Sequence, residues 1–188
     1  MRFDTEKEKK ELRETKITSE EIFDGKILHV IRDIVRLPDG SESFREVIRH
    51  IGAVCVIPVS EDGQVYVERQ YRYPVDTVIT EIPAGKLDSP EEDRLEAAKR
   101  ELREETGLTA DEWINMGDNY SAAAYCDETI TMFLARGLHK GKQALDKGEF
   151  LNVVTVPLEE LVQEVMDGKI PDGKTQIAIL KAARYLNL

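Results

Sequence analysis

One segment in the middle of this chain encodes a helix together with both of its ends. The segment is residues 89–107, SPEEDRLEAAKRELREETG. Ser89 suits an N-cap, Pro90 suits the first helical position, and Glu92 completes a capping box three residues after the cap. Gly107 suits the left-handed position that follows a helix. We therefore expect a helix that begins at Pro90 and ends just before Gly107.

The apolar face of this helix should pack on a sheet, and three acidic residues lie beside it. The apolar residues that share this face are Leu95, Ala98 and Leu102. Glu101, Glu104 and Glu105 are neighbours at spacings of three and four, in the last turns, where the helix dipole is negative. Each unfavourable placement there costs about 0.3–1 kcal/mol. A bound Mg²⁺ would turn this cost into coordination, although charge spacing alone favours a solvated acidic face.

The charge balance argues against some classes of function. The 188 residues carry 37 acidic and 26 basic side chains, which gives a net charge of −11. General nucleic-acid binding and binding to an anionic membrane both need basic surface, so we expect neither. An anionic substrate would instead require a locally recruited cation, and a divalent metal is the obvious one. Cys55 and Cys126 form no CxxC motif and residues 1–16 lack the apolar core of a signal peptide, so we expect a cytoplasmic protein.

The flanking sequence predicts an α+β fold. Residues 1–16 form a charged lead that is either disordered or a frayed helix, and residues 17–50 form an antiparallel β unit with a turn at 38–40. The main domain is residues 51–188. Its strands are expected at 51–59, 64–72, 78–82, 113–119, 130–135 and 150–156. Two helices close the chain, at about 158–167 and 174–185.

The sequence around the central helix resembles the Nudix box, G-x5-E-x7-R-E-U-x-E-E-x-G-U with U aliphatic. Its second half, RELREETGL at residues 100–108, matches at every specified position. The first half departs from the pattern, because Glu92 follows Gly85 at one residue more than the pattern allows and Glu91 lies too far from Arg100. We take Glu92 as the equivalent, since a loop tolerates an insertion better than a helix does. Glu92 is expected to cap and to form a salt bridge, without a metal role.

From about residue 17 onward the chain resembles the ADP-ribose pyrophosphatase branch of the Nudix hydrolases. The similarity includes EIPAGKLD before the box and EFLNV, PLEEL and DGKI after it. It implies an α/β/α sandwich around a mixed sheet. It also implies an N-terminal β unit that exchanges between the subunits of a homodimer, and a requirement for Mg²⁺, with Mn²⁺ as a substitute.

The resemblance also implies roles for single residues. Glu101 and Glu105 should be metal ligands, and Glu104 should bind or orient a second ion and so take part in catalysis. The backbone carbonyl of Ala84 should complete the metal shell. Gly85 should leave room for the metal and the pyrophosphate of the substrate. An ordinary tight turn at these last two positions is compatible with the same roles.

The general base in this branch is usually a glutamate on a loop after the box. Glu149 aligns best, and Asp146 on the same loop is the alternative. Arg72 matches a position that often holds a phosphate-binding arginine, and Arg49 is a second candidate. Either arginine could instead be an ordinary surface residue.

The exact substrate is left open by the residues that follow the box. Relatives often carry a Ser-Pro-Gly-like loop there that marks a preference for ADP-ribose, whereas residues 121–128 read SAAAYCDE and match only its acidic end. Glu128 is then a candidate for contact with the terminal ribose or the nucleophilic water. Phe23 and Tyr71 are candidates to stack on adenine, although an aromatic residue in a β unit is more often part of a core.

Three functions are compatible with the sequence. The favoured one is divalent-metal-dependent hydrolysis of the pyrophosphate bond of ADP-ribose or a related ADP-sugar, which gives AMP and a sugar phosphate such as ribose 5-phosphate. The alternative is a Nudix pyrophosphatase that acts on another nucleotide sugar, such as GDP-mannose, or on a dinucleotide. A non-enzymatic nucleotide-binding module is the least favoured, because all the helix glutamates are present.

Overall fold

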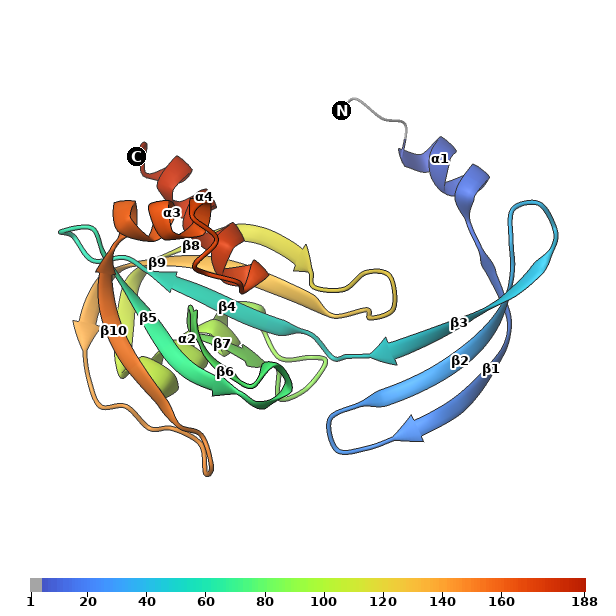
Figure 1. The fold of residues 1–188 in the computed structure, drawn as a ribbon, viewed down its shortest axis with the longest axis horizontal. Coiled ribbons are helices and arrows are strands. Elements are labelled where there is room, and N and C mark those ends of the chain that lie inside the picture. The colour runs from blue at the N-terminus through green and yellow to red at the C-terminus, as the bar shows by residue number, and fades with distance from the viewer. Residues whose placement is uncertain (1–4) are drawn as a thin grey trace. The chain divides into compact units, whose positions relative to one another are not determined.

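The computed structural model describes residues 5–188, which form two compact units. The smaller unit contains the N-terminal segment up to His50 and the loop 122–128, and the larger unit contains residues 51–121 and 129–188. Figure 1 shows the strands and helices of both units and confirms the α+β class. No helix among residues 5–188 is long and apolar enough to cross a membrane.

The smaller unit is built on a three-stranded antiparallel sheet. Its elements are helix α1 (Thr5–Leu12) and strands β1 (Thr15–Asp24), β2 (His29–Arg36) and β3 (Glu42–Arg49), in the order β1-β2-β3. The predicted turn before Ser41 is confirmed, since Gly40 has a φ of +86° and the Asp39 carboxylate accepts a hydrogen bond from the Ser41 N–H at 2.9 Å. Residues 1–4 of the predicted charged lead lie outside the described residues, and the predicted domain boundaries stay predictions.

The larger unit contains a mixed four-stranded sheet and a separate three-stranded antiparallel sheet. The mixed sheet has the order β7-β4-β9-β8, in which only β4 and β9 are parallel. Its strands are β4 (Ala53–Pro58), β7 (Ala84–Lys86), β8 (Leu108–Tyr120) and β9 (Thr129–Lys140). The second sheet has the order β10-β5-β6, with β5 (Gln64–Arg72), β6 (Thr77–Glu81) and β10 (Leu151–Pro157). A short 3₁₀ turn, η1 (Tyr73–Val75), joins β5 to β6.

Helices cover both faces of the mixed sheet, because its central strands are apolar on both sides. Helices α3 (Leu158–Met166) and α4 (Gly173–Tyr185) share one buried cluster with Cys55 and Ile57 of β4. Helix α2 (Arg94–Thr106) shares the other cluster with Val54 and Val56. Figure 1 shows α3 and α4 on one side of these strands and α2 on the other. The predicted α/β/α sandwich is therefore confirmed.

The start of α2 differs from the prediction, whereas its end does not. The N-cap is Asp93, whose Oδ1 accepts hydrogen bonds from the N–H groups of Leu95 (2.9 Å) and Glu96 (3.0 Å). The predicted N-cap at Ser89 is wrong, because the Ser89 carbonyl instead accepts the Glu92 N–H in a turn that precedes the helix. Aspartate caps a helix as well as serine does, so two competent caps were present and the later one is used. Gly107 ends the helix with a φ of +73°, as predicted.

Candidate active site

An acidic cavity of about 260 Å³ lies in the larger unit where three chain segments meet. The segments are β7 with the turn after it, the C-terminal half of α2, and the loop before β10. The cavity brings together seven residues singled out in the sequence: Ala84, Gly85, Glu101, Glu104, Glu105, Asp146 and Glu149. Their individual roles stay predictions, but their common location is a property of the fold.

Helix α2 presents its glutamates to this cavity because its neighbouring residues are fixed in the core. Ala98 and Leu102 are fully buried against the sheet. Glu105, one turn further on, is only 5% exposed and accepts a hydrogen bond from the Ala84 N–H at 2.9 Å. The helix terminus thus holds a carboxylate directly against β7.

Gly85 is required by the close approach of Glu101. A Cβ atom built at position 85 would lie 1.9 Å from Oε1 of Glu101 and 2.0 Å from its carboxyl carbon. Such distances are sterically impossible, so any side chain at this position would have to displace the Glu101 carboxylate. The glycine therefore keeps open the space that this carboxylate occupies.

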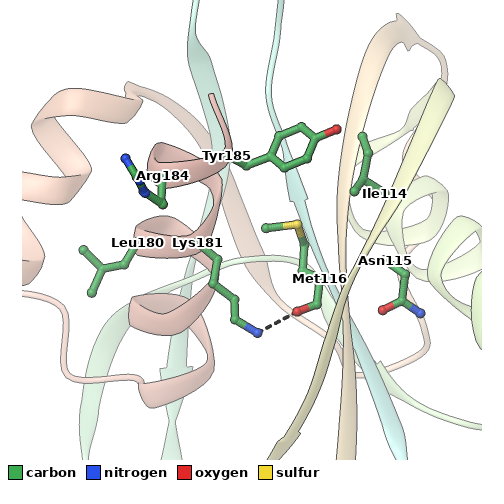
Figure 2. A pocket seen from close by; sticks show the side chains of 7 residues that line it. All are labelled: Ile114, Asn115, Met116, Leu180, Lys181, Arg184 and Tyr185. Atoms are coloured by element: carbon green, nitrogen blue, oxygen red, sulfur yellow. Dashed lines mark hydrogen bonds between the residues drawn. The ribbon is translucent and has the colours of Figure 1, made fainter. Parts of the chain in front are cut away.

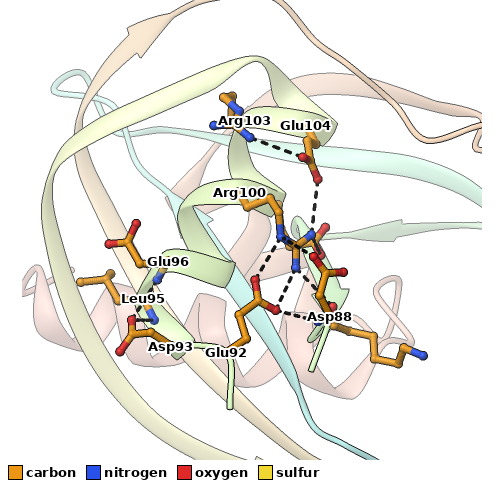
Figure 3. A network of polar contacts seen from close by, with 10 residues as sticks. Asp88, Glu92, Asp93, Leu95, Glu96, Arg100, Arg103 and Glu104 are labelled. Atoms are coloured by element: carbon orange, nitrogen blue, oxygen red, sulfur yellow. Dashed lines mark hydrogen bonds and ion pairs between the residues drawn. The ribbon is translucent and has the colours of Figure 1, made fainter. Parts of the chain in front are cut away.

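Arg100 connects the glutamates of the cavity to the turn before α2 (Figure 3). Its guanidinium lies 2.7 Å from Glu101, 3.4 Å from Glu104 and 3.2 Å from Glu92. Glu92 in turn accepts the Asp88 N–H at 2.6 Å. The expected salt bridge of Glu92 is confirmed, whereas its expected capping role is wrong, because Glu92 precedes the N-cap Asp93 and accepts the Asp88 N–H in the turn before the helix. Arg100 offsets part of the repulsion among the acids, but it makes no contact with Glu105 in the described structure.

The basic side chains of the protein do not fully neutralise the carboxylates of Glu101 and Glu105. Burial raises the pKa of Glu105 to about 10, and the negative charges of Glu68 and Glu101 act in the same direction. The Ala84 N–H opposes this shift. Burial also raises the pKa of Glu101, although Arg100 favours its charged form. A cation at this place would favour ionisation of both groups.

The loop that carries Asp146 and Glu149 is tied to the end of α2. The Gly141 N–H donates to the carbonyl of Gly107 at 2.7 Å, and the Ala144 N–H donates to the carbonyl of Glu104 at 2.9 Å. The Gln143 side-chain amide donates to the carbonyl of Glu105. These bonds satisfy carbonyls at the helix terminus and bring the loop to the cavity.

Glu68 on β5 is a residue near the cavity that the sequence analysis missed. Its side chain is 2% exposed, and its Oε1 has no hydrogen-bond partner in the part of the chain that the structure describes. Burial is the main reason that its pKa is raised to about 8, and the negative charges of Glu149 and Glu81 raise it further. The available signal was an acidic residue that directly follows the apolar positions of a strand, Val65 and Val67.

Arg72, a predicted phosphate-binding residue, lies on β5 and is held by Glu81. Its Nε and Nη2 donate to the two oxygens of Glu81 at 2.6 and 3.0 Å. Lys174, which the sequence analysis also missed, bonds to Glu81 at 2.5 Å and to Asp172 at 3.1 Å. Arg72 is therefore oriented by a carboxylate and still partly exposed, while its contact with a phosphate stays a prediction.

Two other predicted substrate-binding residues belong to the smaller unit. Arg49 pairs with Asp127 at 2.8 Å and more weakly with Asp33 at 3.9 Å. Glu128 lies 3.6 Å from the imidazole of His50. These contacts show what each side chain does within its own unit. Their roles toward a substrate stay predictions.

The two aromatic candidates for adenine stacking are not core residues. Phe23 in the smaller unit is 55% exposed, and Tyr71 in the larger unit is 51% exposed. The Tyr71 hydroxyl donates to Asp76 at 2.6 Å, and its ring lines a separate cavity of about 350 Å³ with Phe150. Both rings therefore remain accessible, and their stacking on adenine stays a prediction.

A larger cavity, of about 520 Å³, lies between β8 and α4 (Figure 2). Its lining is mainly apolar and includes Ile114, Met116 and Leu180. The Lys181 ammonium donates to the carbonyl of Met116 at 2.6 Å. No acidic side chain lines this cavity, so it lacks the carboxylate ligands that usually hold a divalent cation. The acidic cavity is the candidate active site.

The sequence matches two family models that together span most of the chain. A model described as NUDIX domain matches residues 49–176, and one described as Nucleoside diphosphate sugar hydrolase N-terminal domain matches residues 14–48. The chain belongs to the Nudix family. Nudix hydrolases depend on divalent metal ions, so the question for this Nudix hydrolase is whether its acidic cavity suits such an ion.

Relatives of this Nudix hydrolase match it along nearly their whole length. An ADP-ribose pyrophosphatase of Bacillus subtilis is 39% identical over 181 residues, 95% of each chain. A methanol dehydrogenase activator of Bacillus methanolicus is 38% identical over 177 residues, 93% of each chain. A solved structure described as an ADP compounds hydrolase has a TM-score of 0.84 at 22% identity and covers 93% of this chain and 95% of that chain. This last similarity supports the fold.

The residues of the Nudix hydrolase fit a divalent cation chemically. The cavity supplies several carboxylates, a buried carboxylate oxygen without a described partner lies on β5, and Gly85 makes room for the Glu101 carboxylate. Hard cations take such oxygen ligands. In residues 5–188, no group of three His, Cys, Asp or Glu side chains is already arranged as a complete set of metal ligands. Arg100 holds Glu101, and the Ala84 N–H holds Glu105.

Proposed function

We propose that this Nudix hydrolase cleaves the pyrophosphate bond of ADP-ribose, or of a related ADP-sugar, and releases AMP and a sugar phosphate. For ADP-ribose the second product is ribose 5-phosphate. The observation that carries the proposal is the cavity in which Glu101, Glu104 and Glu105 of the Nudix box meet Gly85. The match over 95% of both chains to a protein named ADP-ribose pyrophosphatase supports this substrate.

Mg²⁺ is the proposed cofactor, with Mn²⁺ as a substitute. Glu101, Glu105 and the carbonyl of Ala84 would hold the ion, and Glu104 would bind or orient a second one. When bound, such an ion neutralises the pyrophosphate oxygens and the charge that develops on the leaving phosphate. The protein contributes a cavity whose carboxylates have too few basic partners, so that ion binding relieves repulsion.

Glu149 is the proposed general base for the attacking water. As the water oxygen bonds to one phosphorus, the bond from that phosphorus to the bridging oxygen breaks, and the water proton passes to the Glu149 carboxylate. Asp146 is the alternative base, since both residues line the cavity. Glu149 is favoured because its charge acts on Glu68, Glu101 and Glu105, which places its carboxylate near the inner acids.

Substrate contacts are proposed for the remaining residues. Arg72 would donate to a phosphate, and Gly85 would allow the pyrophosphate to approach the backbone. Arg49 and Glu128 are also proposed to contact the substrate. A partly exposed guanidinium that a carboxylate already orients, as in Arg72, suits phosphate binding because little side-chain freedom is then lost.

The choice between the two bases predicts different effects of matched amide substitutions. We expect Glu149→Gln to lower kcat by about 10²- to 10⁴-fold, the usual contribution of a positioned base. Asp146→Asn should lower kcat by less than about tenfold. Initial rates with saturating ADP-ribose and Mg²⁺ measure both variants. A larger loss in Asp146→Asn than in Glu149→Gln would exchange the two assignments.

The function is tested by product analysis. The protein is incubated with ADP-ribose and Mg²⁺, and the products are separated and identified by mass. We expect equal amounts of AMP and ribose 5-phosphate, and no products when a chelator is present. Hydrolysis in water labelled with oxygen-18 would show which phosphate carries the new oxygen. Failure to form AMP, together with activity on another nucleotide, would reject ADP-ribose as the substrate.

A second candidate substrate class is another nucleotide sugar, such as GDP-mannose, or a dinucleotide. The description of the family model that matches residues 14–48, which names nucleoside diphosphate sugars, favours keeping this class in view. A panel of nucleoside diphosphate compounds compared by kcat/KM separates it from ADP-ribose. A protein that binds these nucleotides and hydrolyses none with any divalent ion would be the non-enzymatic module instead.

A homodimer formed through the N-terminal β unit is proposed with this function. All residues of β1 are exposed in the single chain, and exposed apolar side chains of the sheet include Ile17, Ile22 and Phe44. A sheet with this much exposed apolar surface suits a protein partner, and a second copy is the partner proposed. We expect light scattering to give twice the chain mass of 21.4 kDa. The chain mass alone, at micromolar concentration, would reject the dimer.

A cytoplasmic location is also proposed. Cys55 and Cys126 are both free, the state that a reducing compartment maintains.

A further inference from the structure

Close to Glu105 of the acidic cavity lies a buried carboxylate that the Nudix box does not include. Glu68 comes from β5 and is 2% exposed. Its Oε1 is buried and lacks a hydrogen-bond partner in the described part of the chain. A buried charged oxygen without a partner is costly, typically several kcal/mol, unless a cation or a proton satisfies it. The presence of such an atom therefore calls for a physical explanation.

The alternation of β5 directs Glu68 toward α2. Val65 and Val67 pack in the cluster that contains α3 and α4, while Tyr66 packs against the cluster that contains α2. Successive side chains of a strand point to opposite faces, so Glu68 shares the face of Tyr66. The charge on Glu68 also acts on Glu105 more strongly than that of any other side chain. Both observations place the Glu68 carboxylate beside the C-terminal end of α2.

The basic residues around Glu68 bond to other acids. Arg72 donates both of its bonds to Glu81, and Lys174 bonds to Glu81 and Asp172. Their charges moderate the repulsion at Glu68, but neither side chain reaches its Oε1. Among the described residues no basic side chain satisfies this oxygen, which leaves a bound cation or a proton to do so.

We propose that Glu68 on β5 is an additional carboxylate of the divalent-cation site, beside Glu105. The proposal rests on the proposed function, because it concerns the same cavity. It adds a residue of β5 to the metal-binding glutamates proposed on α2. Glu68 would then hold the ion together with Glu101 and Glu105 of α2, and the ion would satisfy its unpartnered oxygen.

Mn²⁺ binding to the protein without substrate tests the proposal independently of catalysis. Mn²⁺ is titrated into wild type and into Glu68→Gln, and free Mn²⁺ is followed by electron paramagnetic resonance. We expect Glu68→Gln to weaken Mn²⁺ binding by about 10- to 100-fold, the range found when groups that support metal ligands are removed. Mg²⁺ competition should show the same loss.

Glu112→Gln is the matched control for the change of one charge. Glu112 is a strand residue of β8 with a half-exposed side chain that lies 3.7 Å from Arg136. Its substitution should change Mn²⁺ affinity by less than about twofold, because exposed charges are screened by water and salt. Equal losses in the two variants would show a general charge effect and overturn the proposal.

Thermal unfolding without metal separates a metal role from a purely structural one. Glu68→Gln should melt at the same temperature as wild type or higher, because the amide avoids the cost of ionising a buried carboxyl group. A lower melting temperature with unchanged Mn²⁺ affinity would overturn the proposal. Glu68→Asp, which keeps the charge but shortens its reach, should weaken binding less than Glu68→Gln does, so that the position stays testable if the amide variant folds poorly.

The outcome also distinguishes this inference from the proposed function. Wild type that binds Mn²⁺ and hydrolyses ADP-ribose, with unchanged affinity in Glu68→Gln, rejects the role of Glu68 alone. Wild type that binds no Mn²⁺ rejects both.

Discussion

Replacing Glu105 by glutamine should lower kcat by about 10²- to 10³-fold while the protein remains folded. Glutamine keeps the shape of the side chain, and its carbonyl oxygen can still accept the Ala84 N–H. It removes the negative charge that would bind the divalent ion, and losing one preorganised electrostatic contact in an active site costs about this much. Without metal the raised pKa keeps Glu105 protonated, so glutamine replaces a neutral group of the same shape and stability should not fall.

Steady-state kinetics with saturating Mg²⁺ and a thermal melt measure the two effects. The control is Glu96→Gln on the first turn of the same helix, where the side chain is exposed and pairs with Lys99 at 2.7 Å. That variant should retain wild-type kcat. Unchanged turnover in Glu105→Gln would remove Glu105 from the metal-binding set.

In the presence of a chelator, the free energy of unfolding should decrease as the pH rises from about 5 to 8. The pKa of Glu68 is raised to about 8 and that of Glu105 to about 10 from an ordinary value of 4.5. The folded protein therefore retains protons in this range that the unfolded chain has released. Such stability is fully present below the unfolded pKa and is lost as the pH rises through the folded values. Each retained proton contributes a slope of at most about 1.4 kcal/mol per pH unit.

Denaturant unfolding at pH 5, 6, 7 and 8, with chelator and then with excess Mg²⁺, measures this dependence. Mg²⁺ should stabilise the protein more at pH 8 than at pH 5, because metal ligands must be deprotonated. The Glu105→Gln variant should show a shallower decrease with chelator, since one of the two groups is absent. Stability that rises between pH 5 and 8 without metal would contradict the assignment of buried, repelling carboxylates.

Local sequence was sufficient for the elements whose ends are set by short-range chemistry. Gly107 ends α2 in the left-handed conformation that a glycine adopts without strain, and Gly40 does the same at the turn of the smaller unit. The apolar run at 51–59 predicted β4, whereas β7 next to α2 was not predicted and β8 begins at Leu108 rather than at Trp113. The common location of Glu101, Glu104 and Glu105 followed from helix geometry alone.

Sequence was insufficient where two local solutions were equally good or where partners are distant along the chain. Asp93 and Ser89 are both competent caps, and the position of the preceding turn selects Asp93. The bonds of Arg72 and Lys174 to Glu81 join three segments that no spacing rule connects. Glu68 was missed for the same reason, because only the fold shows that its side chain is buried near α2, which is distant from it in the sequence.

The sequence by itself determined the helix that ends at Gly107, the acids of its last turns and the family to which they belong. These features depend on residues within two helical turns of one another, so spacing alone specifies them. Only the tertiary structure decided that Glu105 is buried against Ala84 and that Glu68, on strand β5, lies near Glu105. The physical reason is that burial removes water from charged groups, and burial depends on packing among segments far apart in the chain.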